Sequence, residues 1–185
     1  VHAEADRYGE EQKERLRRFR GIGLCPARFR VGGICDPGGE KKETETMNEI
    51  SYLYPVKIAL AEGEIETGNS LLKTKTMQIG LGENDVATVK GKSRIVLDFG
   101  KEVCGGVRVL MHYINDGEPV RIRFGESLSE ALTPLGVKNA TNDHSPRDFA
   151  VTFSQLSDGR YGNTGFRFVC FEFTGGKYRI KSILA

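Results

Sequence analysis

The chain has 185 residues and a net charge of +2, from 27 basic and 25 acidic residues. This length allows one sizeable domain with a hydrophobic core, and a composition of 38% hydrophobic and 28% charged residues is typical of a globular chain. The near balance of charge argues against a nucleic-acid surface, which needs a clustered excess of Lys and Arg. No apolar stretch approaches the roughly 20 residues of a membrane-spanning helix. The chain has no Trp, so a sugar-binding surface would have to use Tyr or Arg.

The first 49 residues differ in pattern from the rest of the chain. Residues 4–20 are highly charged and carry few apolar residues, with acidic residues near the start and basic ones near the end. This distribution suits the dipole of a short peripheral helix. Residues 21–49 contain several Gly and Pro residues and a polar run, which predicts a loop. We therefore expect a helix-and-loop segment over residues 1–49 and a β-domain over residues 50–185.

From residue 50 onward, apolar residues recur at every second position, as in a half-buried strand. The first such run spans 50–60. Further strands are expected at Leu71–Ile79, Ser93–Phe99, Gly106–Ile114, Val120–Phe124, Phe149–Phe153, Phe166–Phe173 and Tyr178–Ile183. Arg121 and Arg123 alternate with the apolar residues of their run, which predicts one solvent-facing side there. Turn residues are found at 115–117, 157–159 and 175–176. The pattern predicts an all-β, antiparallel, jelly-roll-like β-sandwich with a short N-terminal helix.

The most unusual polar chemistry lies in the sequence KNATNDHSPRD, residues 138–148. Its candidate site residues are Asn139, Asn142, Asp143, His144, Arg147 and Asp148. One interpretation is structural, because Asn and Asp side chains bond to nearby backbone and hold irregular loops. A second is a carbohydrate contact, because amide, carboxylate and guanidinium groups can bond to vicinal hydroxyls. A third is calcium, which takes several Asp and Asn oxygens, although the EF-hand spacing is absent. We expect no cofactor otherwise.

A catalytic pair of carboxylates is not expected here. Glu126, Glu130, Asp143 and Asp148 are candidates only because they are acidic, whereas a glycosidase needs two carboxyl groups at fixed separation with different pKa values. Ser127 and Glu130 have the spacing of a capping box, which gives them a structural alternative. The nucleophile-elbow, P-loop and zinc-protease motifs are all absent from the sequence.

The four cysteines are Cys25, Cys35, Cys104 and Cys170. None belongs to a Cys-X-X-Cys pair, which argues against a zinc site. The simplest interpretation is that they are buried, reduced thiols, and Cys104 and Cys170 both lie in strand-like runs. A bridge between Cys25 and Cys35 is an alternative in an exported chain.

Four motifs follow one another from residue 94: RIVLDFGKEVCGGVRV, RIRFGESLSEA, KNATNDHSPRD and GNTGFRFVCFEF. In this order they resemble the accessory β-domain of bacterial α-L-rhamnosidases, which are glycoside hydrolases. The closing YRIKSILA resembles the strand that leads into the catalytic barrel of that family. The match rests on Asp98, Gly100, Gly105, Gly106, Gly125, Glu126, Asn139, Asn142, His144, Asp148, Gly165 and Arg167. It covers roughly the second half of the chain.

The resemblance implies a non-catalytic domain that packs against and supports its own C-terminal catalytic barrel. In that family the catalytic carboxylates lie in the barrel, which this sequence does not contain, so no catalytic residue is assigned here. The implied parent removes terminal rhamnose from glycans and is periplasmic or secreted in a bacterium. The alternative is an independent carbohydrate-binding module that uses residues 138–148 to bind rhamnose-containing glycans.

Overall fold

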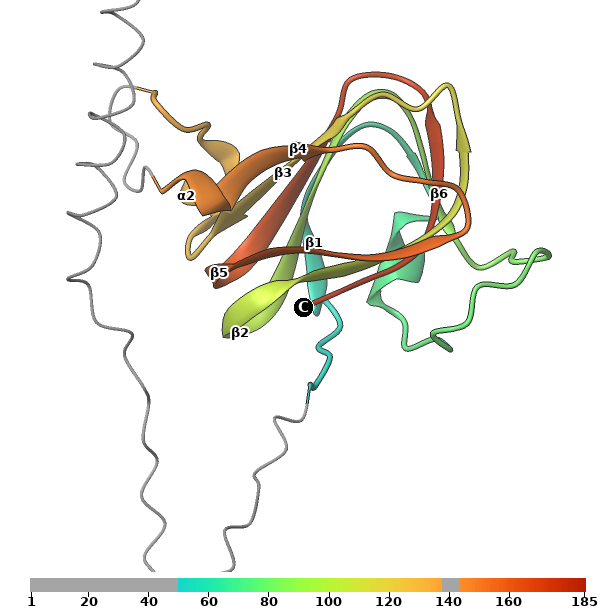
Figure 1. Cartoon of the computed structure of the whole chain (residues 1–185), viewed down its shortest axis with the longest axis horizontal. Coiled ribbons are helices and arrows are strands. Elements are labelled where there is room, and N and C mark those ends of the chain that lie inside the picture. Colours follow the sequence, from blue (N-terminus) through green and yellow to red (C-terminus); the bar gives the residue numbers. More distant parts are fainter. Residues whose placement is uncertain (1–49, 138–143) are drawn as a thin grey trace, which may run out of the picture. The chain divides into compact units, whose positions relative to one another are not determined.

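A computed structural model describes residues 50–137 and 144–185 of the chain (Figure 1). The strands are β1 (Lys57–Glu66), β2 (Ala87–Asn115), β3 (Val120–Gly125), β4 (Asp148–Val151), β5 (Ser157–Phe173) and β6 (Lys177–Leu184). The short helical elements are the 3₁₀ turns η2 (Gly68–Leu72) and η3 (Ser145–Arg147) and the α-helix α2 (Leu128–Leu132). The N-terminal helix predicted over residues 4–20 lies outside the described residues.

All six described strands belong to one antiparallel sheet with the order β1-β2-β5-β3-β4, and β6 pairs with β2. Within β6, Lys177 lies opposite both Lys90 and Asn115, which are near the two ends of β2. Strand β2 therefore curls until its two ends flank β6, and Figure 1 shows the long strands bending over together. The predicted all-β antiparallel fold is confirmed, with its layers formed by one continuous curled sheet.

Strand β2 is 29 residues long and includes two strands that the sequence predicted separately. The connection between them is a pair of bulges, with register shifts between Asp98 and Val103 and between Gly105 and Val107. The Asp98 carboxylate stabilises the first bulge by accepting the Gly100 N–H at 2.7 Å, and Gly100 has a left-handed φ of +77°. A bulge bends a strand and increases its twist, which lets β2 curl without being interrupted.

The interior of the curled sheet is filled with aliphatic and aromatic side chains. Phe166 is central, with its ring 5.9 Å from that of Phe99 and 4.7 Å from that of Phe124, both in edge-on geometry. Farther along, Phe173 packs against Tyr178 with ring centroids 4.9 Å apart. Fully burying one such side chain stabilises the fold by about 1.5–3 kcal/mol relative to its exposed state.

Three details of the predicted strands are wrong. The strand expected at 71–79 is absent, because Leu71 is buried in η2 and the residues after Leu72 are irregular. The strand expected from residue 50 begins only at Lys57. Residues 157–159 begin β5 instead of forming a turn, and the reversal is at Leu156, which has a left-handed φ of 52°.

The outer side of β3 is less exposed than its alternation predicted. Arg121 faces solvent, but Arg123 is only 2% exposed. The Arg123 guanidinium donates to the Ala131 carbonyl at 3.2 Å and pairs with Glu172 at 2.9 Å. Arg123 is therefore covered by α2, the helix that contains Ala131. An arginine on the polar side of a strand can thus become buried when a neighbouring helix covers it.

Candidate functional site

The structure describes half of the candidate residues in the 138–148 loop. Asn139, Asn142 and Asp143 lie outside the described residues. His144 is exposed and its carbonyl accepts the Arg147 N–H at 3.1 Å, while Arg147 and Asp148 are both buried. The chain places Arg147 and Asp148 next to the segment that follows α2, and their contacts show what these two residues do.

Arg147 is 2% exposed and lies against the C-terminal end of α2. Its guanidinium donates to the Glu130 carbonyl at 3.0 Å and to the Thr133 carbonyl at 3.1 and 3.2 Å. The last carbonyls of a helix lack partners within the helix, and a cation there is favoured by the helix dipole. Arg147 therefore caps α2 and holds the loop after it, which is a structural role.

The Asp148 carboxylate has a 0% exposed side chain and accepts three hydrogen bonds. Arg121 donates to its two oxygens at 2.6 and 3.1 Å, and the Leu135 N–H donates at 3.1 Å. Burial is the strongest single influence on this group and opposes ionisation. The effect of burial is outweighed by the hydrogen bonds from Arg121 and Leu135 and by the charges of nearby arginines. The pKa of Asp148 therefore lies below its ordinary value. These contacts match the structural interpretation of this part of the loop.

A separate pocket of about 750 Å³ lies beside the bulged part of β2. Its lining comes from the residues before β1, the β2 bulges, β5 and the last residue: Ile50, Ser51, Tyr52, Leu53, Lys101, Glu102, Val103, Cys104, Gly105, Gly106, Val107, Arg108, Arg160, Gly162 and Ala185. We call it the Tyr52 pocket. The backbone of Leu53 bonds to that of Ala185 at 2.8 and 2.9 Å, which joins two distant segments at the pocket wall.

Glycines allow two strands to cross closely beside the pocket. Strands β2 and β5 approach so closely that a Cβ on Gly106 would lie 2.2 Å from the Gly162 carbonyl oxygen. Gly162 also has a left-handed φ of +79°, and a Cβ there would meet the Phe124 ring at 2.6 Å. Side chains are therefore excluded at this crossing, and the exposed backbone forms part of the pocket lining.

The polar wall of the pocket is built around Tyr52. The Arg108 guanidinium carbon lies 4.8 Å from the centre of the Tyr52 ring and that of Arg160 lies at 5.7 Å, both within cation–π range. Arg160 also donates to the Tyr52 hydroxyl at 2.5 Å. Tyr52 therefore orients two cationic side chains, and its ring and hydroxyl are both used.

Arg108 and Arg160 are directly opposite each other in the β2–β5 ladder. Like charges at such positions destabilise a sheet unless a counter-charge lies nearby. Asp158 supplies one, since its oxygens accept from Arg108 Nε at 2.7 Å and from Arg108 Nη2 at 2.5 Å. The hydrogen bonds from Arg108, helped by the charges of Arg108 and Arg160, hold the pKa of Asp158 below its ordinary value. Asp158 therefore binds the Arg108 guanidinium directly, while Arg160 interacts with it only through its charge.

Sequence reasoning missed this pocket. Tyr52 and Arg160 are 108 positions apart, and Arg108 lies between them in an unremarkable strand pattern. Only the pairing of β2 with β5, and of residue 53 with residue 185, brings them together. The one local signal is the Gly105-Gly106 pair in the motif RIVLDFGKEVCGGVRV.

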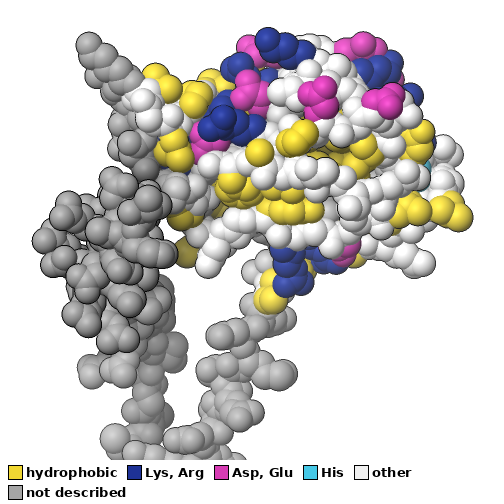
Figure 2. Space-filling view, turned by 45° about the horizontal axis from the view of Figure 1, so that its top comes forward, with side chains coloured by type: hydrophobic (Ala, Val, Ile, Leu, Met, Phe, Trp, Pro, Cys, Tyr) yellow, Lys and Arg dark blue, Asp and Glu magenta, His cyan; other side chains and the backbone are white. Residues whose placement is uncertain are grey.

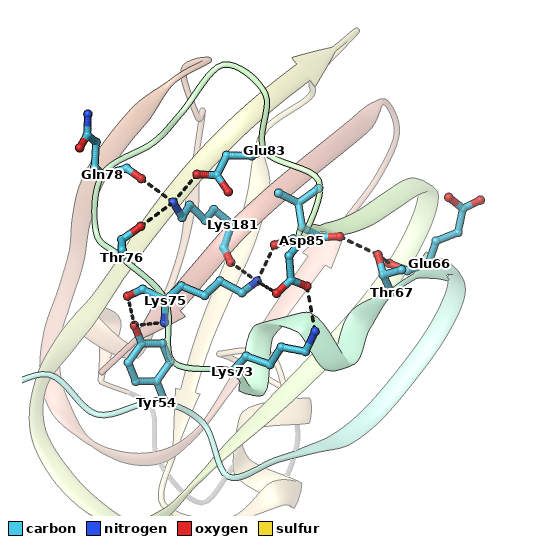
Figure 3. A network of polar contacts seen from close by, with 11 residues as sticks. Tyr54, Glu66, Thr67, Lys73, Lys75, Thr76, Gln78, Glu83, Asp85 and Lys181 are labelled. Atoms are coloured by element: carbon cyan, nitrogen blue, oxygen red, sulfur yellow. Dashed lines mark hydrogen bonds and ion pairs between the residues drawn. The ribbon is translucent and has the colours of Figure 1, made fainter.

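A second polar network lies elsewhere, where the segment between η2 and β2 contacts β6 (Figure 3). Lys75 Nζ donates to the Asp85 carbonyl at 2.6 Å and to the Lys181 carbonyl at 3.0 Å. Lys181 Nζ, on β6, donates to the Glu83 carboxylate and the Gln78 carbonyl. Both lysine side chains are at most 8% exposed, and burial lowers the pKa of Lys75. The network fixes an irregular segment to the sheet and leaves little room for a ligand.

Five carboxylates of the described residues have a pKa below the ordinary value, because each accepts hydrogen bonds from cations or backbone N–H groups: Glu66, Glu83, Asp98, Asp148 and Asp158. A general acid needs a raised pKa. Residues 50–137 and 144–185 also contain no cluster of three or more His, Cys, Asp or Glu side chains suited to a metal ion.

The two described cysteines differ from each other. Cys170 is fully buried, and burial raises the pKa of its thiol, as expected for a structural thiol. Cys104 is exposed on the Tyr52 pocket, which corrects the expectation that it would be buried. Cys25 and Cys35 lie outside the described residues. Within the described part of the chain, no helix is both long enough and apolar enough to cross a membrane.

Comparison with protein-family models and with curated proteins finds no match to this chain. Among solved structures, a rhamnosidase from Klebsiella oxytoca with rhamnose bound is similar at 15% identity and a TM-score of 0.47. That match covers 72% of this chain and 28% of the rhamnosidase chain, so this chain spans less than a third of that protein's length.

Two further solved structures are similar over most of their own length. The C-terminal domain of a chitobiase from Bacteroides fragilis has 14% identity and a TM-score of 0.46, with 72% of this chain and 95% of that domain covered. A fucose binding module from Streptococcus pneumoniae has 9% identity and a TM-score of 0.47, with 73% and 96% covered. Likenesses at this level concern the fold alone, and a ligand has to be argued from this chain's own residues.

Proposed function

We propose that this chain is a non-catalytic accessory β-domain of a glycoside hydrolase of the α-L-rhamnosidase type, and that it binds a glycan in the Tyr52 pocket. The observation that carries the binding role is the pocket itself. Its volume of about 750 Å³ lies within the range of about 300–1,000 Å³ that is usual for small-ligand sites. Its wall combines apolar side chains with a few convergent polar groups, which is the usual composition of such sites.

The parent enzyme is proposed from the sequence motifs, and the structure gives those motif residues physical roles. Asp98 and Arg167 form a two-pronged ion pair across β2 and β5, with distances of 2.8 and 3.0 Å. Gly105 and Gly106 line the Tyr52 pocket. The resemblance thus rests on residues that build the bulged strand pair and the pocket. A periplasmic or secreted location, which the parent type implies, is part of the same proposal.

Absence of catalysis is proposed from the state of the carboxylates. The Asp98, Asp148 and Asp158 side chains are each paired with an arginine that holds the pKa below its ordinary value. Groups in this state are ionised at neutral pH and cannot protonate a glycosidic oxygen. The acid and base are therefore expected in another part of the parent enzyme.

The binding site is proposed at the Tyr52 pocket in preference to the 138–148 loop. In that loop, the side-chain groups of Arg147 and Asp148 are engaged by the carbonyls after α2, by Arg121 and by the Leu135 N–H. A sugar would have to displace these bonds, and leaving a buried polar group unpaired costs about 1–3 kcal/mol. In the pocket, the corresponding polar groups line a space that is already open.

A supporting role against a catalytic barrel is the second candidate. Ile50, which lines the pocket, is 62% exposed, and Val56 nearby in the sequence is 60% exposed. Figure 2 shows hydrophobic side chains gathered in a band on one face, beside intermixed basic and acidic side chains. Contiguous apolar surface of this kind is favourable for packing against another protein surface.

Calorimetric titration of the purified chain with L-rhamnose and a rhamnosylated oligosaccharide separates the two roles. Binding predicts saturable heat with a dissociation constant between millimolar and micromolar, about 4–8 kcal/mol of binding free energy. Tyr52→Leu should weaken it at least tenfold, and Asn142→Ala, in the loop, should leave it unchanged. If instead Asn142→Ala weakened binding and Tyr52→Leu left it unchanged, the site would lie in residues 138–148. Absence of heat with either sugar would leave the supporting role as the better proposal.

A further inference from the structure

We propose that the Tyr52 pocket selects an acidic sugar, a hexuronate residue of a glycan, whose carboxylate binds the Arg160 guanidinium. This inference rests on the proposed glycan-binding function and deepens it, because neutral rhamnose would make no use of the charge in the pocket. It is carried by the distribution of charge, by the hydrogen-bond donors of Arg160 and by the apolar lining beside them.

The side-chain charges at the pocket do not balance. Lys101, Arg108 and Arg160 line it as cations, while the side chains of Glu102 and the adjacent Asp158 supply two negative charges. Asp158 is committed to Arg108 through both carboxylate oxygens. The field of Glu102 acts on Arg167, outside the pocket. Lys101 and Arg160 belong to none of the ion pairs among the described residues, and the charge of Arg160 reaches Asp158 only at longer range. An anionic group is therefore the complement that this wall lacks.

Arg160 is placed to bind a carboxylate. Its described hydrogen bond runs from Nη2 to the neutral Tyr52 hydroxyl, which fixes the guanidinium without neutralising it. The remaining donors form the planar fork that pairs with a carboxylate through two parallel hydrogen bonds. Because Arg160 is exposed, a ligand can reach it without opening the fold.

The ladder position of Arg160 adds a second argument. Arg108 and Arg160 are direct cross-strand partners, an arrangement that one Asp only half compensates. A bound anion would supply the missing counter-charge, so the arrangement has a clear use in a site for acidic ligands.

The apolar part of the lining points to a sugar acid in preference to an inorganic anion. Ile50, Leu53 and Val103 line the same pocket. A hexuronate has a carboxylate on one side of a ring and C–H groups that can contact apolar side chains, whereas sulfate or phosphate has only polar oxygens. The pocket therefore offers complementary surface to both parts of a uronate.

The test compares two ligands that differ in the charge of one carboxyl group and in the methyl group that removes it: methyl α-D-galacturonoside and its methyl ester. Each is titrated into the full chain and followed by calorimetry and by amide chemical shifts. We expect the acid to bind at least tenfold more tightly than the ester, with the preference shrinking as salt is raised. Arg160→Met should abolish the preference. Lys92→Met, which removes a positive charge from an exposed site outside the pocket lining, should retain it.

The outcomes separate this inference from the proposed function. Equal binding of acid and ester, or binding of rhamnose alone, would overturn the uronate inference and leave glycan binding in place. Absence of binding by rhamnose, acid and ester would overturn both. Inorganic sulfate binding as tightly as the acid, with the same dependence on Arg160, would overturn the assignment to a sugar. Circular dichroism of Arg160→Met confirms that the variant is folded before any loss is interpreted.

Discussion

Replacing Asp148 with Ala should destabilise the domain by about 2–4 kcal/mol at pH 7 and leave ligand affinity at the Tyr52 pocket unchanged. This substitution tests whether the Asp148 end of the loop is structural, and it does so with two independent measurements on one protein.

The magnitude follows from the contacts of the carboxylate. Its side chain is 0% exposed and accepts two hydrogen bonds from Arg121 and one from the Leu135 N–H. Breaking a buried ion pair by removing one partner costs about 3–5 kcal/mol. Arg121 is 48% exposed, so water can solvate it after the change and the ion-pair cost falls to about 1 kcal/mol. The unpaired Leu135 N–H adds about 1–3 kcal/mol, so the total is about 2–4 kcal/mol.

The effect should also depend on pH in a defined direction. The pKa of Asp148 is lowered in the folded state, so the folded protein favours the ionised form. Its charge therefore stabilises the fold fully above the unfolded-state pKa of about 4, and this contribution falls as the pH decreases from there to the folded-state pKa. The loss is at most about 1.4 kcal/mol per pH unit in that window. The difference between wild type and Asp148→Ala should shrink accordingly.

Urea unfolding followed by circular dichroism at pH 7 and at pH 3 gives both differences. Glu126→Ala removes an exposed carboxylate near α2 and serves as the matched control, with an expected change within about 0.5 kcal/mol. A destabilisation below 1 kcal/mol at pH 7, or a difference that grows at pH 3, would refute the reasoning. If Asp148→Ala kept its full stability but lost sugar binding, Asp148 would be a ligand contact.

Two further experiments test the network in Figure 3 and the strand crossing beside the pocket. Lys181→Met should destabilise the domain by about 2–4 kcal/mol, because it removes a buried cation that donates to Glu83 and Gln78. In urea unfolding, the double variant Lys181→Met, Glu83→Gln should lose less stability than the sum of the two single variants. Gly162→Ala should cost more than Gly91→Ala in thermal unfolding, since both residues have positive φ but only at Gly162 would a Cβ meet a ring, at 2.6 Å. Equal costs would show that backbone strain alone decides.

The strands that could be predicted are those whose burial alternates locally. The apolar positions of β3, Val120, Ile122 and Phe124, are all fully buried as their period of two indicated. The prediction failed where a distant element changed the environment. Arg123 became buried because α2 covers it, and the run at 71–79 lost its strand because Leu71 packs into the core from a 3₁₀ turn. Neither outcome can be deduced from a short window of sequence.

The candidate site was harder to predict because polar residue type does not reveal which polar groups remain available. The 138–148 loop and the Tyr52 pocket both contain arginine and aspartate. In the loop, Arg147 donates to a carbonyl of the short helix α2, and Asp148 accepts from an N–H of the irregular chain that follows. Such backbone groups need hydrogen-bond partners wherever they are buried. A dense run of polar residues is therefore what an irregular segment requires for its own stability. In the pocket, Asp158 compensates only one of two guanidinium groups, and the excess faces an open space. An unbalanced charge at an open surface, more than a concentration of polar residues, is what points to a ligand.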